Sequence, residues 1–162
     1  GTISITKKRL TGHIMDTTNL GTLIGFSSDG KMYKAKVNEI PLEKGIKATQ
    51  LFKVRNIIDV MCVEEIEKAS YFYFATKGGY IKKSNTSDYN YSGRNGTKYI
   101  KLRPDDEVIE LMLSNDEGKL VYYLEYNKPI VVKKEIKPTG IAAFGTQVEK
   151  EKRILHIGEK ND

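Results

Sequence analysis

The sequence predicts an all-β protein in which about three repeats each supply a sheet of four antiparallel strands. One apolar–turn–basic unit occurs three times, at residues 26–40, 74–89 and 123–136. Between these units, short segments with period-two alternation and many β-branched or aromatic residues predict further strands. Four strands roughly every 45–50 residues are typical of proteins whose sheets pack face to face as radial repeats.

The recurring unit predicts a β-hairpin. Four positions after an aromatic residue stands a residue type that tolerates positive φ, namely Gly30, Gly78 and Asn127. The pair Asp29-Gly30 predicts a type I′ turn between two alternating segments. The aromatic residues themselves lie 48 and 49 residues apart, at Phe26, Phe74 and Tyr123.

Each hairpin is followed by a half-repeat in which a glycine begins one strand and an apolar run forms another. The four glycines are Gly1, Gly45, Gly96 and Gly140. Helix signals are scarce, and the short charged segment 64–70 predicts a loop or a single helical turn. The chain divides into a half-repeat at 1–22, repeats at 23–70 and 71–118, and a degenerate last repeat at 119–162. Because it starts within a repeat, we expect a C-terminal piece of a longer protein.

Charge is segregated along the chain. The net charge is +6, and residues 71–103 hold seven basic side chains against one acidic one. Residues 104–126 hold seven acidic side chains against one basic one. Blocks of one sign create a local potential able to hold a polyanion.

The composition predicts no metal, cofactor or membrane segment. Cys62 is the only cysteine and lies in an apolar run, so it is expected in the core, and one cysteine fits a reducing cytoplasm. His13 and His156 have no ligand-type neighbours at zinc spacing. No apolar run approaches the roughly 20 residues that span a membrane.

The segment LIGFSSDGKMYKAKVNEIP…KGIKATQLF resembles a blade of the C-terminal DNA-binding domain of the bacterial type IIA topoisomerase A subunit. This subunit occurs in DNA gyrase and in topoisomerase IV. Residues 71–113 resemble the next blade, with its aromatic-T-x-x-G-x-x-K-[KR] hairpin. The resemblance covers nearly all of the chain.

The resemblance implies a partial β-pinwheel: about three propeller-like blades of four antiparallel strands, with strands exchanged between blades and DNA bent around a basic outer rim. The chain lacks the Q-R-R-G-G-K-G box of gyrase, of which SGRNGTK at 92–98 is a partial echo. Gyrase and topoisomerase IV therefore both remain open as the parent.

Basic residues of the rim are the predicted DNA-binding side chains. Each hairpin carries lysines after its turn, and stacked blades would align them into a stripe, although any single lysine at an exposed edge also blocks edge pairing. The glycine loop 92–98 either clamps a phosphate with backbone N–H groups or is a plain turn, and the tyrosines beside it are expected to pack between blades. The predicted set is Lys31, Lys34, Lys36, Lys77, Lys82, Lys83, Arg94, Lys98, Lys101, Arg103, Lys133 and Lys134.

The sequence thus predicts a non-catalytic module that binds and bends duplex DNA with little sequence preference. It contains no P-loop, nucleophile elbow or metal-spaced cluster. The resemblance implies three partners: double-stranded DNA, the catalytic core of the same polypeptide and, through that core, the B subunit. The place implied is the bacterial cytoplasm, at the nucleoid. The alternative is a propeller-type protein-interaction module that does not bind DNA.

Overall fold

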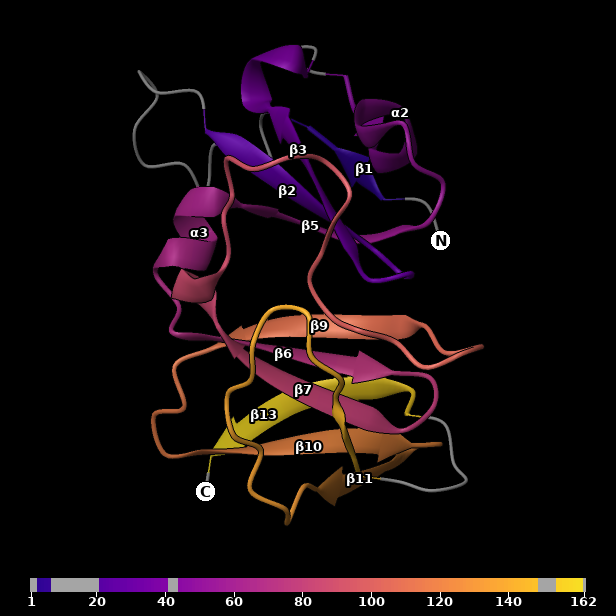
Figure 1. Cartoon of the computed structure of the whole chain (residues 1–162), viewed down its shortest axis with the longest axis vertical. Coiled ribbons are helices and arrows are strands. Elements are labelled where there is room, and N and C mark those ends of the chain that lie inside the picture. Colours follow the sequence, from indigo (N-terminus) through magenta and orange to yellow (C-terminus); the bar gives the residue numbers. More distant parts are fainter. Residues whose placement is uncertain (1–2, 7–20, 41–43, 149–153, 162) are drawn as a thin grey trace.

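The structure, a computed structural model, describes residues 3–6, 21–40, 44–148 and 154–161. Within these residues, three antiparallel sheets are stacked along the long axis of the molecule (Figure 1). A further two-stranded sheet pairs β1 (Ser4–Ile5) with β4 (Ile46–Lys47). Most of the predicted half-repeat 1–22, including Gly1 and His13, lies outside the described residues.

The first sheet has the strand order β5-β2-β3-β8. Its hairpin consists of β2 (Thr22–Ser27) and β3 (Lys31–Lys36). The strand β5 (Ile57–Cys62) pairs with the other side of β2, and β8 (Thr97–Lys98) pairs with β3.

The second sheet repeats this order as β9-β6-β7-β12. Its hairpin consists of β6 (Tyr71–Thr76) and β7 (Tyr80–Asn85), flanked by β9 (Val108–Ser114) and β12 (Thr146–Gln147). The third sheet holds β13 (His156–Asn161), β10 (Lys119–Glu125) and β11 (Lys128–Val131), in that order. The apolar segments around Phe74 and Tyr123 form central strands, as their two-sided hydrophobicity predicts.

Strands are exchanged between successive repeats. The strand β8 follows the second hairpin in sequence, yet it completes the edge of the first sheet. Likewise β12 follows the third hairpin and completes the second sheet. These two exchanges, with the antiparallel pairing of all the named strands, confirm the predicted partial β-pinwheel.

Short helices connect some of the strands. The helix α3 (Val63–Glu67) is the single turn predicted from the charged segment. The helix α2 (Ala48–Phe52) replaces most of a strand that the sequence predicted after Gly45, because its Ala48 and Phe52 pack one helical turn apart against the first sheet. Two 3₁₀ turns, η1 (Val37–Glu39) and η2 (Thr86–Asp88), end β3 and β7.

The repeat length is 49 residues in the first two hairpins. Phe26 pairs with Met32, and Ala75 pairs with Ile81. Gly79, with a φ of 91°, is therefore the counterpart of Gly30, with a φ of 86°. The assignment of Gly78 as the turn glycine was one position too early.

The turns themselves differ from the expected type I′. Only Gly30 of the pair Asp29-Gly30 has positive φ, and its N–H donates to the Ser27 carbonyl at 3.1 Å. In the third hairpin, Tyr126 rather than Asn127 has positive φ, at 55°. That turn is shorter because Glu125 pairs directly with Lys128.

Two apolar layers join the three sheets. Between the first and second sheets lie Phe26, Phe72, Phe74 and Tyr99, with aromatic ring centroids 4.8–5.7 Å apart. Between the second and third sheets lie Tyr73, Ile81, Tyr123 and Ile157. A third cluster covers the other face of the first sheet and includes Cys62, whose thiol pKa burial raises to about 11, with Glu65 and Glu64 adding to the effect.

Candidate nucleic-acid interface

The outer edge of the first sheet gathers cations from two repeats. Along β3, Met32 and Ala35 are buried in clusters on opposite faces of the sheet, whereas Lys34 and Lys36 are exposed. Lys34 and Lys36 are two residues apart and therefore project from the same face of the strand. The exchanged strand β8 places Lys98 directly opposite Lys31. With Arg94, these side chains form what we call the first rim, made of Lys31, Lys34, Lys36, Arg94 and Lys98.

Little within the described residues neutralises the first rim. The Lys31 ammonium lies 3.9 Å from the Asp29 carboxylate, but both side chains are exposed and such pairs contribute little. Like charges directly across a β-pair repel each other, as Lys31 and Lys98 do. A bound anion would relieve that repulsion.

A segment that we call the first strap, residues 89–99, fixes the glycine loop against β3. The Lys34 ammonium donates to the Ser92 carbonyl at 2.9 Å, and the Lys34 N–H donates to Asn95 Oδ1 at 2.9 Å. The Gly96 N–H donates to the Met32 carbonyl at 2.8 Å. Tyr99 is buried, and its hydroxyl donates to the Ser27 carbonyl at 2.7 Å.

This docking changes the expected role of the glycine loop. The N–H groups of Ser92, Gly93 and Gly96 donate to Asn90 Oδ1, the Asn90 carbonyl and the Met32 carbonyl. They are therefore not available to clamp a phosphate, and the loop offers the side chains of Arg94 and Lys98 instead. The flanking Tyr89 is buried in the core, as predicted.

Lys82 is not on the surface, which contradicts its predicted place on the rim. Its side chain is 1% exposed. The ammonium donates to three neutral acceptors: the Ser84 hydroxyl, the Tyr89 hydroxyl at 3.2 Å and the Tyr99 carbonyl at 3.3 Å. Burial lowers the pKa of Lys82 to about 8, with Asp88 acting in the opposite direction. Lys82 therefore holds the first strap from inside the molecule.

Lys83 is also buried, and the structure corrects its assignment too. Its ammonium pairs with Asp116 and lies 4.0 Å from the centroid of the Tyr71 ring. Burial opposes ionisation of Asp116, but hydrogen bonds from Lys83, Tyr73 and Ser114 outweigh it and hold the pKa of Asp116 below its usual value. Both lysines are buried because the second sheet has a neighbouring sheet on each face.

A second group of cations surrounds two aromatic rings beside β7. The Arg103 guanidinium lies between Tyr80 and Phe144, with its Cζ 3.9 and 4.5 Å from the two ring centroids. The Lys101 ammonium lies 4.9 Å from the Phe144 centroid. We call Lys77, Lys101, Arg103 and these two rings the second rim.

A cavity of about 360 Å³ opens beside the second rim. Lys77, Tyr80 and Arg103 line it together with Asp105 and Asp106. Asp106 Oδ1 accepts the N–H groups of Gly78 and Glu107, both at 2.8 Å, so this carboxylate shapes the adjoining turn.

The remaining predicted residues, Lys133 and Lys134, are exposed on the segment after β11. The Lys134 ammonium donates to the Gln147 carbonyl at 3.1 Å, at the end of β12. Contact of any of these cations with DNA stays a prediction. The sequence did not indicate Tyr80, Asn95 or Phe144, although the 49-residue period places Asn95 and Phe144 at equivalent positions.

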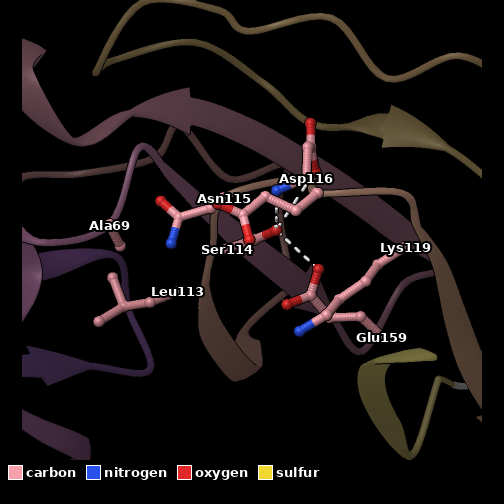
Figure 2. Close-up of a pocket in the computed structure, with 8 residues that line it drawn as sticks. Ala69, Leu113, Ser114, Asn115, Asp116, Lys119 and Glu159 are labelled. Atoms are coloured by element: carbon pink, nitrogen blue, oxygen red, sulfur yellow. Dashed lines mark hydrogen bonds between the residues drawn. The ribbon is translucent and has the colours of Figure 1, made fainter. Parts of the chain in front are cut away.

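A different pocket, of about 210 Å³, lies between the second and third sheets and is acidic (Figure 2). Asp116, Glu117 and Glu159 line it with Lys119. The buried Ser114 hydroxyl donates to the Glu159 carboxylate at 2.6 Å, and it accepts a hydrogen bond from the Asp116 backbone N–H at 3.0 Å. Such a lining repels phosphate, so this pocket is not part of the basic surface.

In the described part of the chain, no three His, Cys, Asp or Glu side chains come close enough to hold a metal ion. Nor does that part contain a helix long and apolar enough to cross a membrane.

Comparison with known proteins identifies two of the repeats. The family described as "DNA gyrase C-terminal domain, beta-propeller" matches residues 21–48 and 70–115. The A subunit of DNA gyrase from Streptococcus pyogenes serotype M3 is 28% identical over 118 residues, 67% of this chain. Its counterpart from Lawsonia intracellularis is 32% identical over 102 residues, 57% of this chain. The matched regions are 14% and 12% of those two proteins.

Solved structures share the fold. The C-terminal domain of DNA topoisomerase IV superposes with a TM-score of 0.71 at 20% identity, covering 88% of this chain and 48% of that one. The E. coli ParC C-terminal domain gives a TM-score of 0.61 at 18% identity, covering 88% of this chain and 61% of that one. Residues 21–48 and 70–115 therefore belong to the family of DNA gyrase C-terminal β-propeller domains, and the chain shares the fold of the two solved C-terminal domains.

Proposed function

We propose that this chain is a non-catalytic module that binds and bends duplex DNA along its first and second rims, with little dependence on base sequence. The observation that carries the proposal is the first rim, where strand exchange brings five cations from two repeats to one exposed edge. Phosphate contacts of this kind position a duplex without reading its bases.

The expected strength of binding follows from the number of phosphates contacted. If about six cations of the two rims engage, the logarithm of affinity falls against the logarithm of salt concentration with a slope of about −5. Bending a site of 20–30 base pairs by 40–90° costs on the order of 1–6 kcal/mol, so contacts at more than one rim are needed to offset it.

Fluorescence anisotropy with a random 40-base-pair duplex at several salt concentrations tests the proposal. The informative variant is Lys34→Glu with Lys98→Glu, which reverses two charges of the first rim. We expect its affinity to fall by at least about tenfold, and its salt slope to become shallower by about 2.

The matched control is Lys119→Glu with Lys160→Glu, two exposed lysines of the third sheet that lie outside both rims. It makes the same change of net charge, so it separates a specific rim from a general charge effect. Equal losses in the two double variants would contradict the rim as the binding surface. No duplex binding by the unaltered chain at low salt would overturn the proposal and favour a protein-interaction module.

For the parent protein, we propose the A subunit of an ATP-dependent type II DNA topoisomerase in the bacterial cytoplasm. There the domain would deliver a bent DNA segment to the cleavage core of its own subunit, which works with the B subunit in supercoiling or in relaxation and decatenation. The match of two repeats to the gyrase C-terminal domain family, and the similarity to gyrase A subunits, support this proposal. Restoration of DNA wrapping or strand passage by a parent protein carrying this domain, and not by one carrying the first-rim variant, is the corresponding test.

A further inference from the structure

We propose that Phe144 acts as an apolar wedge that inserts between base pairs of the bound duplex and kinks it at the second rim. This inference rests on the proposed function, and it assigns to one side chain the bending that phosphate contacts alone would leave smooth.

The surroundings of Phe144 are unusual for an aromatic residue. Its side chain is 39% exposed, and Tyr126 and Leu155 are the other large apolar side chains exposed in the part of the chain that the structure describes. Phe144 differs from the other two because cations lie over its ring. The Lys101 ammonium is 4.9 Å and the Arg103 Cζ 4.5 Å from the ring centroid. An apolar ring flanked by positive charges matches a duplex, which presents stacked bases between two lines of phosphate.

The backbone beside Phe144 is held firmly. The Lys101 N–H donates to the Ala143 carbonyl at 2.9 Å, immediately before the ring. Immediately after it, Gly145 lies so close to β7 that a Cβ there would be 3.1 Å from Tyr80 Cβ and 3.2 Å from the Ile81 carbonyl carbon. The following strand, β12, is paired with β7. A wedge needs this support, because a loose ring would fold back instead of separating a base step.

The guanidinium of Arg103 is also prepared for a ligand. The rings of Tyr80 and Phe144 pack against it, and no hydrogen bond or ion pair to a described residue engages its N–H groups. Arginine in this state can contact two phosphate oxygens, or enter a minor groove that the wedge has widened. The segment carrying Phe144 follows β11 in the sequence and belongs to the third repeat. It crosses in front of the second sheet in Figure 1.

The first rim provides an internal contrast. Asn95 occupies the position equivalent to Phe144, because Gly96 and Gly145 each precede an exchanged strand in the same register. The side-chain oxygen of Asn95 accepts a hydrogen bond from the Lys34 backbone N–H. The first rim therefore has charge without a wedge, and the second rim has fewer strand lysines with one.

The first test compares the unaltered 162-residue chain with Phe144→Ala and with Leu155→Ala, which truncates an exposed apolar side chain outside both rims. A 30-base-pair duplex carries dyes at its ends and 2-aminopurine at a central TA step. We expect the affinity of Phe144→Ala for the duplex to stay within about threefold of that of the unaltered chain. The efficiency of energy transfer between the end dyes, and the 2-aminopurine fluorescence, should return towards their values in free DNA. Leu155→Ala should leave both signals unchanged. Thermal unfolding of each variant verifies that the fold persists.

A second test uses the absence of tryptophan from this sequence. In Phe144→Trp the new indole is the only one, and insertion should protect it from acrylamide, lowering its quenching constant at least twofold when duplex is added. Tyr126→Trp, on the exposed turn of the third hairpin, is the matched control and should show no change.

The outcomes separate the two proposals. If the unaltered chain binds and bends DNA but Phe144→Ala bends it equally, or if the indole of Phe144→Trp stays fully accessible, the wedge is wrong and the proposed function stands. If the unaltered chain does not bind duplex DNA, both are wrong.

Discussion

The hairpins of the first and second sheets have the same strand register, yet their equivalent lysines lie in opposite environments, one exposed and one buried. Lys34 and Lys83 occupy equivalent positions, 49 residues apart. Lys34 is exposed and bonds to a backbone carbonyl, whereas Lys83 is buried over the Tyr71 and Tyr73 rings and pairs with Asp116. The cross-strand neighbours decide the difference, since the first sheet has Thr22 and Ile24 where the second has these tyrosines. A repeated lysine is therefore a surface charge in one copy and part of the core in another.

The largest expected effect comes from reversing charges at the two hairpins. Lys82→Glu with Lys83→Glu leaves buried carboxylates beside neutral acceptors and Asp116, and we expect it to lower the free energy of unfolding by more than about 3 kcal/mol. Lys31→Glu with Lys34→Glu, on the exposed edge, should change it by less than about 1 kcal/mol. Urea denaturation measures both, and similar losses would contradict the assigned burial.

The next effect is a pH dependence that belongs to the second hairpin alone. The pKa of Lys82 is about 8 in the folded chain, below its ordinary 10.5, so the folded state releases this proton more readily than the unfolded state. The destabilising contribution is fully present below about pH 8 and is progressively relieved as the pH rises from there towards 10.5. We expect Lys82 to contribute a gain on the order of 1–2 kcal/mol between about pH 7.5 and 9.5. The buried Cys62 thiol, whose pKa is raised from 9.0 to about 11, opposes this gain in the same range, so the contribution of Lys82 is measured against a variant that retains Cys62.

Lys82→Met serves as the reference for that measurement. It lacks the titrating amine, while the Tyr89 hydroxyl still donates to the Tyr99 carbonyl at 2.9 Å. The buried Ser84 hydroxyl loses the ammonium as a donor, and this cost does not depend on pH. The difference in unfolding free energy between the two proteins should shrink as the pH rises. Measurements stay below about pH 10, where unfolded tyrosines begin to ionise while burial keeps Tyr89 and Tyr99 protonated by raising their pKa. If the difference in unfolding free energy between the two proteins did not change with pH, Lys82 would not titrate in this range.

A smaller effect distinguishes the two glycines that precede the exchanged strands. Gly96 has a φ of 82°, and a Cβ there would meet only the Tyr33 ring at 4.0 Å, whereas Gly145 lies against the β7 backbone. Asparagine tolerates positive φ, so Gly96→Asn should cost less than about 1 kcal/mol. Gly145→Asn meets backbone that cannot move aside and should cost about 1–3 kcal/mol. Thermal unfolding compares the two, and the reverse order would show that the repeats constrain these positions differently from the structure.

The smallest effect concerns the opposed pair on the first rim. Lys98→Thr removes a like charge facing Lys31, so stability should rise by a few tenths of a kcal/mol at low salt and by less at high salt. Duplex binding should weaken, with a salt slope shallower by about 0.9. A gain in stability that persists at high salt would point to strand propensity instead of charge.

The sequence predicted the architecture well because hairpins are local. Turn glycines, alternation and the spacing of nearly 49 residues are properties of short segments, and these predicted the strands and the repeated sheets. The exchange of strands in a pinwheel was implied by the resemblance to the topoisomerase family. Register was predicted less accurately, since Gly78 was assigned one position before its true counterpart Gly79, and Gly140 five positions before Gly145.

The site was harder to predict because it depends on contacts between repeats. Alternation places Lys82 and Lys83 on opposite faces of a strand, but it does not reveal that both faces are covered. One signal was present, since the apolar partner strand β6 has no polar face. Lys31 lies opposite Lys98, and Arg103 packs on the Phe144 ring, only because strands are exchanged between repeats.

Strand exchange also affects how such a domain can change over time. The edges completed by β8 and β12 are each assembled from two consecutive repeats, so no single repeat encodes a whole rim. Duplicating or deleting one repeat would create new pairings of hairpin and borrowed strand, and would alter two edges at once. A lineage could therefore obtain a different path for its ligand by reordering existing units, without a single point substitution.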